Sequence, residues 1–333
     1  AVDIRHHESR QLADCGDLIT CIRPEGDTVW TGTLKSLGFF CDGRYQRAFD
    51  RPGRPEAGIY SIRRMPGGEL LFGDCDGLFR VKRHPWSAEP VRGSQGLCVR
   101  SLEVVDSDLL VGTYGDGVYL LAGDSLRALP MDQNGFLAHA HGFMRDGTGH
   151  LWISTNHGLF RALWQSILDW RNEPAQRIPY EYFGARSGIS NVEFNGGCDP
   201  PWVLLPNGTA SFPTMGGLVQ FDPEDVRSEI GSGFVLIESI TADDLDIRMT
   251  GAKNLPADVQ QVTIGFSVSF WGDPVDLHIE YRLREADEWR PMDPEQRSIV
   301  VPEPKPGRYE VEVRLVGATI DSPQYHAIYF GVA

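Results

Sequence analysis

The stretch GHLWISTNHGLFRA, residues 149–162, reads as two short apolar strands joined by a polar Asn-His-Gly turn. The first strand carries Trp152, and Gly158 opens the return strand. Such a turn needs a positive φ or a close approach of two backbones, and glycine meets both needs at little cost. The stretch therefore predicts a β-hairpin in which Trp152 and Gly158 are architectural and His157 is a variable tip.

The same pattern recurs along the first two thirds of the chain. In every copy an apolar strand ends in a small residue, a few polar residues follow, and a glycine opens the next strand. The further copies are TVWTGTLKSLGFFC (28–41), ELLFGDCDGLFRV (69–81), DLLVGTYGDGVYLL (108–121) and TASFPTMGGLVQF (209–221). Another extended segment precedes each copy. Four antiparallel strands in a unit of about 40–45 residues are typical of a β-propeller blade.

Five blades are predicted within residues 1–230. Their approximate limits are residues 15–50, 56–92, 96–130, 136–187 and 188–227. The fourth is longest because residues 163–187 interrupt the period, and this insertion is expected to form a short helix or an irregular outer strand. The number of blades stays open between a five-bladed ring and part of a larger propeller, since AVDIRHHESR (1–10) reads like the end of an earlier blade.

A second domain is expected over residues 231–333. Gly231-Ser232-Gly233 interrupts the repeat and is typical of a linker. About seven short strands follow, and in RYEVEVRLVG (308–317) apolar and charged residues alternate. This alternation indicates strands with one face in a core and the other in solvent. The chain is therefore predicted to be all-β, with propeller blades followed by an immunoglobulin-like or fibronectin-like β-sandwich.

The composition limits the partners of the chain. Its net charge of −15 opposes direct binding to nucleic acid or to an anionic membrane surface. No apolar run approaches the roughly 18 residues of a membrane-spanning helix. The six cysteines, at positions 15, 21, 41, 75, 98 and 198, have no metal-ligand spacing, and they leave open whether disulfides form.

The hairpin copy DGTGHLWISTNHGLFRA (146–162) resembles the two-component regulator propeller repeat. The core of that repeat reads Asp-x-x-Gly-x-Leu-Trp-Ile-Gly-Thr, then two variable residues and Gly-Leu. This chain departs from it at Ser154, where the family usually has glycine. Residues 188–227 resemble the family's closing blade, with its Asn-x-Glu-Phe-Asn entry and its terminal Phe-x-Pro.

The second domain resembles the triple-tyrosine (Y_Y_Y) module that follows such propellers. The matching segments are IEYRLREADEWRPM (279–292) and PKPGRYEVEVRLVG (304–317). Together the two resemblances cover almost the whole chain. The ordered pair of closing blade and sandwich is a more specific sign than any single blade.

The resemblance implies a sensor rather than an enzyme. In that family the propeller and sandwich form the periplasmic ectodomain of an inner-membrane protein, and a transmembrane helix and a cytoplasmic output such as a histidine kinase follow. The expected partners are a small-molecule or oligosaccharide ligand and a second copy of the chain in a homodimer. The chain departs from the family by lacking the helix, the output domain and most upstream blades, so we interpret it as a sensor-region fragment or a stand-alone relative.

Ligand-binding residues are predicted on one rim of the propeller. If strand order runs outward from the axis, the hairpin turns share this rim with the segments that enter each inner strand. Acids, amides and aromatic residues mixed in this way suit a small polar ligand, although turns are polar in any case. The candidates are Asp74, Asp76, Tyr114, Asp116, His139, His141, Asn156, His157, Asn191 and Glu193.

Catalytic and metal-binding roles are not predicted, and no cofactor is expected. His139 and His141 lie on one side of a strand and would be two ligands of a metal site with His157, but nothing in the sequence places the set around one ion. Two other functions remain open. A glycoside hydrolase or lyase would need two rim carboxylates at catalytic separation, and a protein-interaction scaffold would need an exposed apolar patch.

Overall fold

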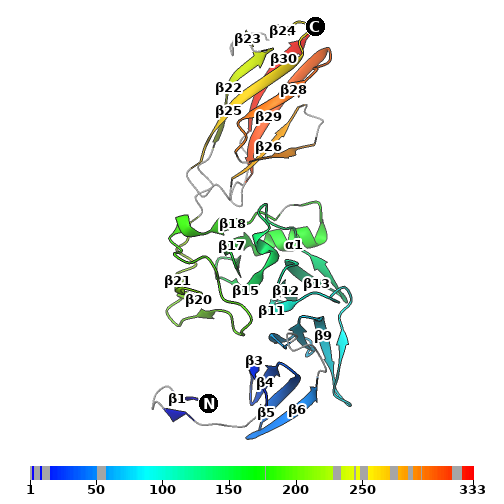
Figure 1. The fold of residues 1–333 in the computed structure, drawn as a ribbon, viewed down its shortest axis with the longest axis vertical. Coiled ribbons are helices and arrows are strands. Elements are labelled where there is room, and N and C mark those ends of the chain that lie inside the picture. Colours follow the sequence, from blue (N-terminus) through cyan, green and yellow to red (C-terminus); the bar gives the residue numbers. More distant parts are fainter. Residues whose placement is uncertain are drawn as a thin grey trace. The chain divides into compact units, whose positions relative to one another are not determined.

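The computed structural model describes residues 2–3, 8–9, 16–50, 58–176, 178–227, 234–243, 245–247, 254–270, 277–283, 288–293, 295–316 and 325–333. The chain divides into two compact units (Figure 1). The first comprises residues 1–178 and 183–226, and the second comprises residues 179–182 and 227–333. Sequence analysis places the corresponding boundary between residues 230 and 231. The chain is nearly all β, as predicted.

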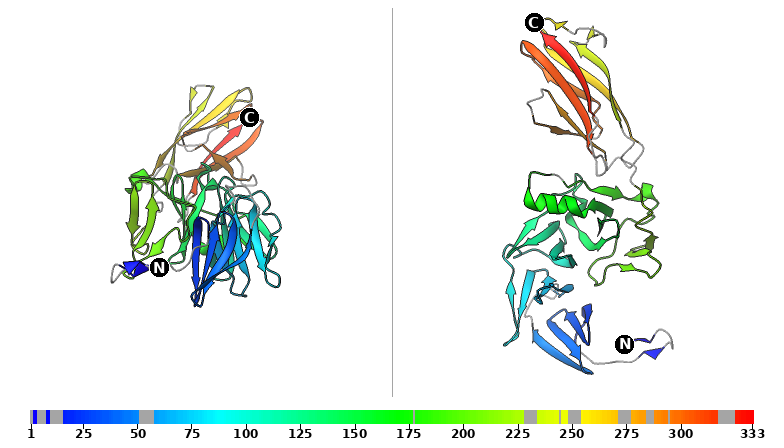
Figure 2. Two further views of the ribbon diagram at one scale, coloured as in Figure 1. Left: turned by 60° about the horizontal axis from the view of Figure 1, so that its bottom comes forward. Right: turned by 180° about the vertical axis from the view of Figure 1, so that it is seen from behind.

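Five antiparallel sheets of three or four strands follow one another along residues 19–221 (Figures 1 and 2). The first four have four strands each and the fifth has three. The first sheet consists of β3 (Ile19–Glu25), β4 (Thr28–Thr33), β5 (Ser36–Cys41) and β6 (Arg44–Asp50). The second consists of β7 (Ser61–Arg64), β8 (Leu70–Asp74), β9 (Gly77–Lys82) and β10 (Ser87–Pro90). The third consists of β11 (Val99–Val105), β12 (Asp108–Thr113), β13 (Val118–Ala122) and β14 (Ser125–Ala128).

The fourth sheet contains the insertion in the repeat. Its strands are β15 (Ala140–Arg145), β16 (His150–Thr155), β17 (Gly158–Leu163) and β18 (Glu181–Phe183). Helix α1 (Trp164–Asn172) lies between β17 and β18, so the insertion supplies both a short helix and an outer strand. Trp164 and Trp170 are buried, which makes them core residues rather than ligand-stacking platforms. The fifth sheet consists of β19 (Val203–Leu204), β20 (Ala210–Thr214) and β21 (Gly217–Phe221).

Short elements complete the first unit. A small hairpin near the N-terminus joins β1 (Val2–Asp3) to β2 (Glu8–Ser9). Two single-turn 3-10 helices, Phe136–Ala138 and Ala185–Ser187, precede β15 and follow β18.

Successive sheets pack against one another through apolar side chains. Trp30 of the first sheet shares a core with Ile62 and Phe72 of the second. Trp152 of the fourth sheet likewise shares a core with Phe212 of the fifth. The first strands of the first four sheets, β3, β7, β11 and β15, contact one another in sequence order and are here called the inner strands. This arrangement is propeller-like, because each sheet buries its apolar faces against its neighbours.

The glycines of the hairpin pattern have the two physical roles expected of them. Gly77 and Gly158 have φ values of 144° and 140°, which side chains rarely tolerate. Gly112 instead allows close approach, since a Cβ there would lie 2.6 Å from the carbonyl oxygen of Ala140 on the next inner strand. The glycines of the repeat therefore allow close packing between neighbouring sheets as well as the turn geometry.

The carboxylate of Asp146 stabilises the hairpin of residues 149–162. Asp146 accepts hydrogen bonds from the backbone N–H groups of Thr148 and His150, and from the indole Nε1 of Trp152 at 2.7 Å. Burial raises the pKa of Asp146, but these hydrogen bonds outweigh it and hold the pKa below its usual value. Asp146 thus fixes both the turn and the buried tryptophan that packs against the fifth sheet.

The second unit contains two sheets around one apolar core. The first sheet has the order β23-β22-β25-β28 and the second has the order β24-β30-β29-β26-β27. The strands are β22 (Phe234–Ala242), β23 (Leu245–Asp246), β24 (Asn254–Leu255), β25 (Gln261–Ser269), β26 (His278–Arg282), β27 (Arg290–Met292), β28 (Ser298–Pro302), β29 (Gly307–Val316) and β30 (Tyr325–Val332). Both sheets contribute to the core, for example through Ile264 and Val313.

Tyr309 of the second unit is a packed core residue. Tyr309 stacks on Phe330 with ring centroids 4.9 Å apart. Trp289 is half-buried, and the guanidinium of Arg314 lies 3.9 Å from its ring centroid. Arg314 also pairs with the buried Glu280 at 2.6 Å. Aromatic and charged side chains therefore pack together over this sheet.

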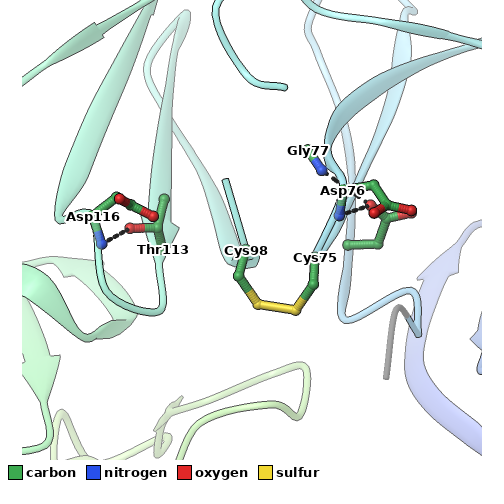
Figure 3. Close-up of a disulfide and its surroundings, with 7 residues drawn as sticks. Cys75, Asp76, Gly77, Cys98, Thr113 and Asp116 are labelled. Atoms are coloured by element: carbon green, nitrogen blue, oxygen red, sulfur yellow. Dashed lines mark hydrogen bonds between the residues drawn. A yellow bond between two sulfur atoms is a disulfide. The ribbon is translucent and has the colours of Figure 1, made fainter. Parts of the chain in front are cut away.

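One disulfide joins neighbouring sheets of the first unit (Figure 3). It links Cys75, in the turn between β8 and β9, to Cys98, just before β11. Cys21 is buried and Cys198 is exposed, and both are free thiols. Burial, with the nearby Asp199 carboxylate, raises the pKa of each above its usual value, which keeps both thiols protonated and unreactive. Cys15 lies outside the described residues.

Candidate functional site at the inner-strand rim

A β-bulge opens the inner strands of the first, third and fourth sheets. The pairing register shifts between Ile19 and Cys21, between Val99 and Ser101, and between Ala140 and Gly142. The extra residues in these bulges are Thr20, Arg100 and His141. A bulged residue leaves the hydrogen-bond ladder and its side chain is redirected. Each of these three bulges therefore redirects one side chain.

The second and fifth sheets place Tyr60 and Asn195 at the corresponding position. The backbone N–H of Tyr60 donates to the carbonyl of Gly73, and that of Asn195 donates to the carbonyl of Pro213. Gly73 and Pro213 occupy the same place in the repeat, at the end of the second strand. The edge of the sheets at which these side chains gather is here called the inner-strand rim.

Arg100 contacts two tyrosine rings at this rim. Its guanidinium carbon is 4.9 Å from the ring centroid of Tyr60 and 4.3 Å from that of Tyr114. Its Nε is buried and has no hydrogen-bond partner among the described residues, and no carboxylate of those residues forms an ion pair with it. The side chain is half-buried. Stacking thus fixes the guanidinium while leaving its N–H donors unused by the described residues.

His141 lies next to Arg100 and is buried. Its Nε2 is 2.5 Å from Oδ1 of Asn156, and its Nδ1 has no partner among the described residues. Burial is the largest cause that lowers the pKa of His141, and the positive charges of Arg100 and His139 lower it further. The hydrogen bond to Asn156 and the charge of Glu193 raise the pKa, but together by less than burial and the two positive charges lower it. His141 is therefore neutral at neutral pH, with Nε2–H donating to Asn156.

Tyr114 and His139 complete the cluster. Their rings meet edge to face with centroids 4.6 Å apart, and their backbones form an isolated antiparallel bridge. Tyr114 is 43% exposed, so its ring is available to a molecule at the rim. Arg100, Tyr114, His139 and His141 thus come together from the third and fourth sheets, with Tyr60 from the second.

A segment of the fifth sheet covers one side of this cluster. Asn195–Trp202, here called the axial segment, runs past three inner strands. A Cβ on Gly196 would lie 2.0 Å from Nδ1 of His141, and one on Gly197 would lie 3.9 Å from a terminal nitrogen of Arg100. Only the missing side chain of Gly196 allows this approach.

The axial segment is anchored by a buried ion cluster. Arg63 on β7 forms a two-pronged ion pair with Asp199, with Nη2 at 2.9 Å from Oδ1, and its Nη2 also lies 3.0 Å from Glu103. Ser61 donates a further hydrogen bond to Asp199 at 3.0 Å. Burial would lower the pKa of Arg63, but Asp199 and Glu103 outweigh it and raise the pKa. Arg63 is a permanent cation with its charge already neutralised.

The structure brings together only some of the residues predicted from the sequence. Tyr114, His139, His141 and Asn156 are in contact, and the charge of the exposed Glu193 acts on His141. Asn191 accepts a hydrogen bond from the backbone N–H of Glu193 at 3.0 Å. His157 stacks on Phe136 with centroids 4.6 Å apart.

The three predicted aspartates lie in hairpin turns. Asp74 is buried and accepts hydrogen bonds from the backbone N–H groups of Asp76 and Gly77. Asp116 is exposed, and its backbone N–H donates to Thr113. Figure 3 shows Asp76 and Asp116 on separate turns, on either side of the disulfide. Asp74 therefore shapes its own turn.

Sequence reasoning missed Arg100, Tyr60 and Gly196. The signal was present in the repeat, because Thr20, Tyr60, Arg100 and His141 recur about every 40 residues, the blade period. The glycines mark the hairpin turns in every copy, whereas the bulge position has no residue type in common between copies. Gly196 is explained only by its contact with His141, which no local pattern reveals.

Neither a metal centre nor a membrane span is found in the described part of the chain. No three His, Cys, Asp or Glu side chains in it are grouped so as to hold a metal ion. No helix in it has the length and apolar character to cross a membrane. The second unit has a polar cavity of about 510 Å³ lined by Thr241, Asp243, Gln260, Gln261 and Thr263. Asp243 there accepts backbone hydrogen bonds from Gln260 and Gln261, which occupy its carboxylate.

Comparison with known proteins gives structural likeness only. No family model and no curated protein matches the chain. The extracellular domain of a putative hybrid two-component system from B. thetaiotaomicron is 15% identical, with a TM-score of 0.36, over 97% of this chain and 56% of that one. PorZ, a surface component of the type-IX secretion system of Porphyromonas gingivalis, is 13% identical, with a TM-score of 0.39, over 95% and 51%. Virginiamycin B lyase from Staphylococcus aureus is 12% identical, with a TM-score of 0.42, over 82% and 83%. The chain thus spans a little over half the length of the sensor ectodomain that it resembles.

Proposed function

We propose that the chain is the ligand-binding part of an extracytoplasmic sensor, and that its ligand binds at the inner-strand rim. The observation that carries this proposal is the convergence of Arg100, Tyr114 and His141, whose polar atoms are not all used by the described residues. Buried polar groups are ordinarily satisfied, so such a cluster is a site where a ligand gains hydrogen bonds that water supplies less well.

An extracytoplasmic location is supported by the disulfide. Cys75 and Cys98 are joined across neighbouring sheets. Disulfides persist in oxidising compartments such as the bacterial periplasm and are rare in the cytosol. The likeness of residues 146–162 and 188–227 to the two-component regulator propeller agrees with this location.

The second unit is proposed to be an immunoglobulin-like Y_Y_Y sandwich that relays binding to a membrane-proximal homodimer. Two sheets around one core and the triple-tyrosine resemblance support this assignment. A ligand shifts such a receptor only by binding one arrangement of its subunits more tightly than another. Rigid-body movement is the mode that suits tightly packed sheets.

The proposed role is binding rather than catalysis. Hydrolysis of a glycoside would need a pair of carboxylates flanking one bond. Asp74 is hydrogen-bonded within its own turn, and the cluster at the rim is made of an arginine, histidines and tyrosines. A kinase activity, if the longer protein has one, would belong to a cytoplasmic domain.

Hydrogen–deuterium exchange on the whole chain tests the proposal. A panel of acidic and neutral monosaccharides, oligosaccharides and small organic acids would be screened by thermal shift, and exchange measured with each binder. Protection is expected in the segments that contain Tyr60, Arg100, Tyr114 and His141. Substitution Tyr114→Ala should abolish the protection, whereas Tyr119→Ala, on β13 of the same sheet, should not. Absence of any binder, or protection confined to the second unit, would contradict the proposed site.

A further inference from the structure

We infer that the inner-strand rim recognises its ligand through a carboxylate group, with the guanidinium of Arg100 as the anchor. The inference names the ligand class and rests on the proposed function above. It follows from the orientation imposed on Arg100, the positive charge around it and the way in which the axial segment covers the site.

The stacking of Arg100 selects a planar anion. The guanidinium carbon lies 4.9 Å from the ring centroid of Tyr60 and 4.3 Å from that of Tyr114, so two cation–π contacts hold the group in place. Its N–H donors, among them the buried Nε, have no hydrogen-bond partner among the described residues and remain for a ligand. Two parallel N–H donors in one plane match the two oxygens of a carboxylate. The rings also fix the side chain before the ligand arrives, which reduces the entropy lost on binding.

The surroundings of Arg100 favour negative charge. Tyr114 contacts the rings of both His139 and His141, and the positive charges of Arg100 and His139 act on His141. The acid that acts on His141 is Glu193, which is exposed and therefore screened by solvent. Arg100 itself forms no ion pair with a carboxylate of the described residues.

Arg63, on the neighbouring inner strand β7, is an arginine whose charge is neutralised within the fold. Arg63 is buried against Asp199 and Glu103, both from other segments of the chain. At Arg100 the same axial segment contributes Gly196 and Gly197 in place of an acid. The segment thus supplies a carboxylate to Arg63 and none to Arg100. We assign the role of the missing partner of Arg100 to the carboxylate of the ligand.

His141 makes binding of this ligand depend on pH. Its low pKa comes from burial, Arg100 and His139, and is opposed by Asn156 and Glu193. A bound carboxylate offsets the charge of Arg100 and favours the protonated imidazole. Because the pKa of the free His141 lies below the ordinary histidine value of about 6.5, binding takes up a proton and strengthens as the pH falls below about 6.5, where a typical carboxylate stays ionised.

Isothermal titration calorimetry with matched acids and amides tests the inference on the whole chain. The probes are glucuronate with glucuronamide, galacturonate with galacturonamide, and succinate with succinamide, each to about 10 mM. An acid is expected to bind on the order of 10- to 100-fold more tightly than its amide. Arg100→Gln should remove this preference, and Arg100→Lys should recover only part of it because lysine cannot form the bidentate contact.

A control variant separates this effect from a general change of charge. Arg145→Gln removes an arginine from the neighbouring inner strand, where it pairs with the exposed Asp106, and should leave the acid preference unchanged. Equal binding of acid and amide, no binding of any acid, or an acid preference that survives Arg100→Gln would overturn the carboxylate assignment. Binding of a neutral ligand with protection at the rim would then still uphold the proposed function, whereas no binding of any compound would remove both.

Discussion

Arg63 and Arg100 lie on neighbouring inner strands, yet the fold uses them in opposite ways. Arg63 is 2% exposed and is held by two carboxylates and a backbone carbonyl. Arg100 is held by two aromatic rings and forms no ion pair with a carboxylate of the described residues. The ion pairs of Arg63 anchor the axial segment to the second sheet. The ring contacts of Arg100 leave a cation at the rim without a bound carboxylate among the described residues.

The difference teaches how a repeated fold separates stability from recognition. A buried ion cluster costs much to break because the remaining charge is left without a partner. A stacked arginine at a half-exposed rim costs little to remove. The two positions are close in the repeat, since Tyr60 occupies the position equivalent to the bulged Arg100 and Arg63 follows three residues after Tyr60. Substitutions at these positions therefore test whether the two arginines differ in their contribution to stability.

The largest effect is expected for Arg63→Met. Removing this cation leaves Asp199 and Glu103 uncompensated, and should lower the free energy of unfolding of the first unit by about 3–5 kcal/mol. Urea titration followed by tryptophan fluorescence measures it. The matched control is Arg64→Met, which breaks the half-exposed pair with Glu25 and should cost no more than about 1 kcal/mol. Equal costs for the two variants would remove the structural role of Arg63.

A smaller loss is expected for Gly112→Ala. The new Cβ would lie 2.6 Å from the carbonyl oxygen of Ala140, which cannot move without shifting the bulge that carries His141. Overpacking of this kind typically costs about 1–3 kcal/mol. Thermal unfolding of the variant is compared with that of Gly67→Ala, where nothing lies within 4 Å of the added atom. If both variants unfold at the same temperature, the third and fourth sheets do not meet as closely as described.

Arg100→Met should change the stability much less than Arg63→Met. It loses two cation–π contacts of about 0.5–1 kcal/mol each, and gains from no longer burying an Nε that lacks a partner among the described residues. The net change in the free energy of unfolding should stay within about 1 kcal/mol. The same urea titration measures it. A loss as large as that of Arg63→Met would show that Arg100 is structural and would weaken its assignment to ligand binding.

The smallest effect concerns pH. The pKa of His141 is lower in the folded chain, so the folded state binds fewer protons than the unfolded state as the pH falls below about 6.5. Its contribution to stability is complete above that pH and is lost as the pH falls toward the folded pKa. His141→Gln should flatten this dependence by less than about 1 kcal/mol per pH unit. Melting temperatures from pH 5 to 8 reveal it, and unchanged curves would contradict a neutral buried His141.

The fold was predictable because it repeats. Five copies of a glycine hairpin report strand positions and turn conformations, and Gly77 and Gly158 indeed have positive φ values. The insertion after β17 was also visible as an interruption of the period. These features depend on residues close together in sequence, where turn chemistry and alternation decide the outcome.

The candidate site was predictable only in part. Tyr114, His139 and His141 belong to segments that the repeat places at one rim. Arg100 and Gly196 depend on contacts between sheets and on a loop that passes three inner strands, and such contacts have no local pattern. Asp74 was misleading for the opposite reason, because its carboxylate serves its own turn.

The bulge at the head of β3, β11 and β15, with the equivalent positions in the second and fifth sheets, has a consequence for how such chains diversify. A bulged residue lies outside the hydrogen-bond ladder, so strand pairing does not restrict its identity. Positions 20, 60, 100, 141 and 195 accordingly hold threonine, tyrosine, arginine, histidine and asparagine, although the surrounding hairpins stay alike. Each sheet therefore contributes to the rim one residue position that strand pairing does not restrict. After gene duplication, substitutions at these positions can change ligand specificity without altering the apolar core.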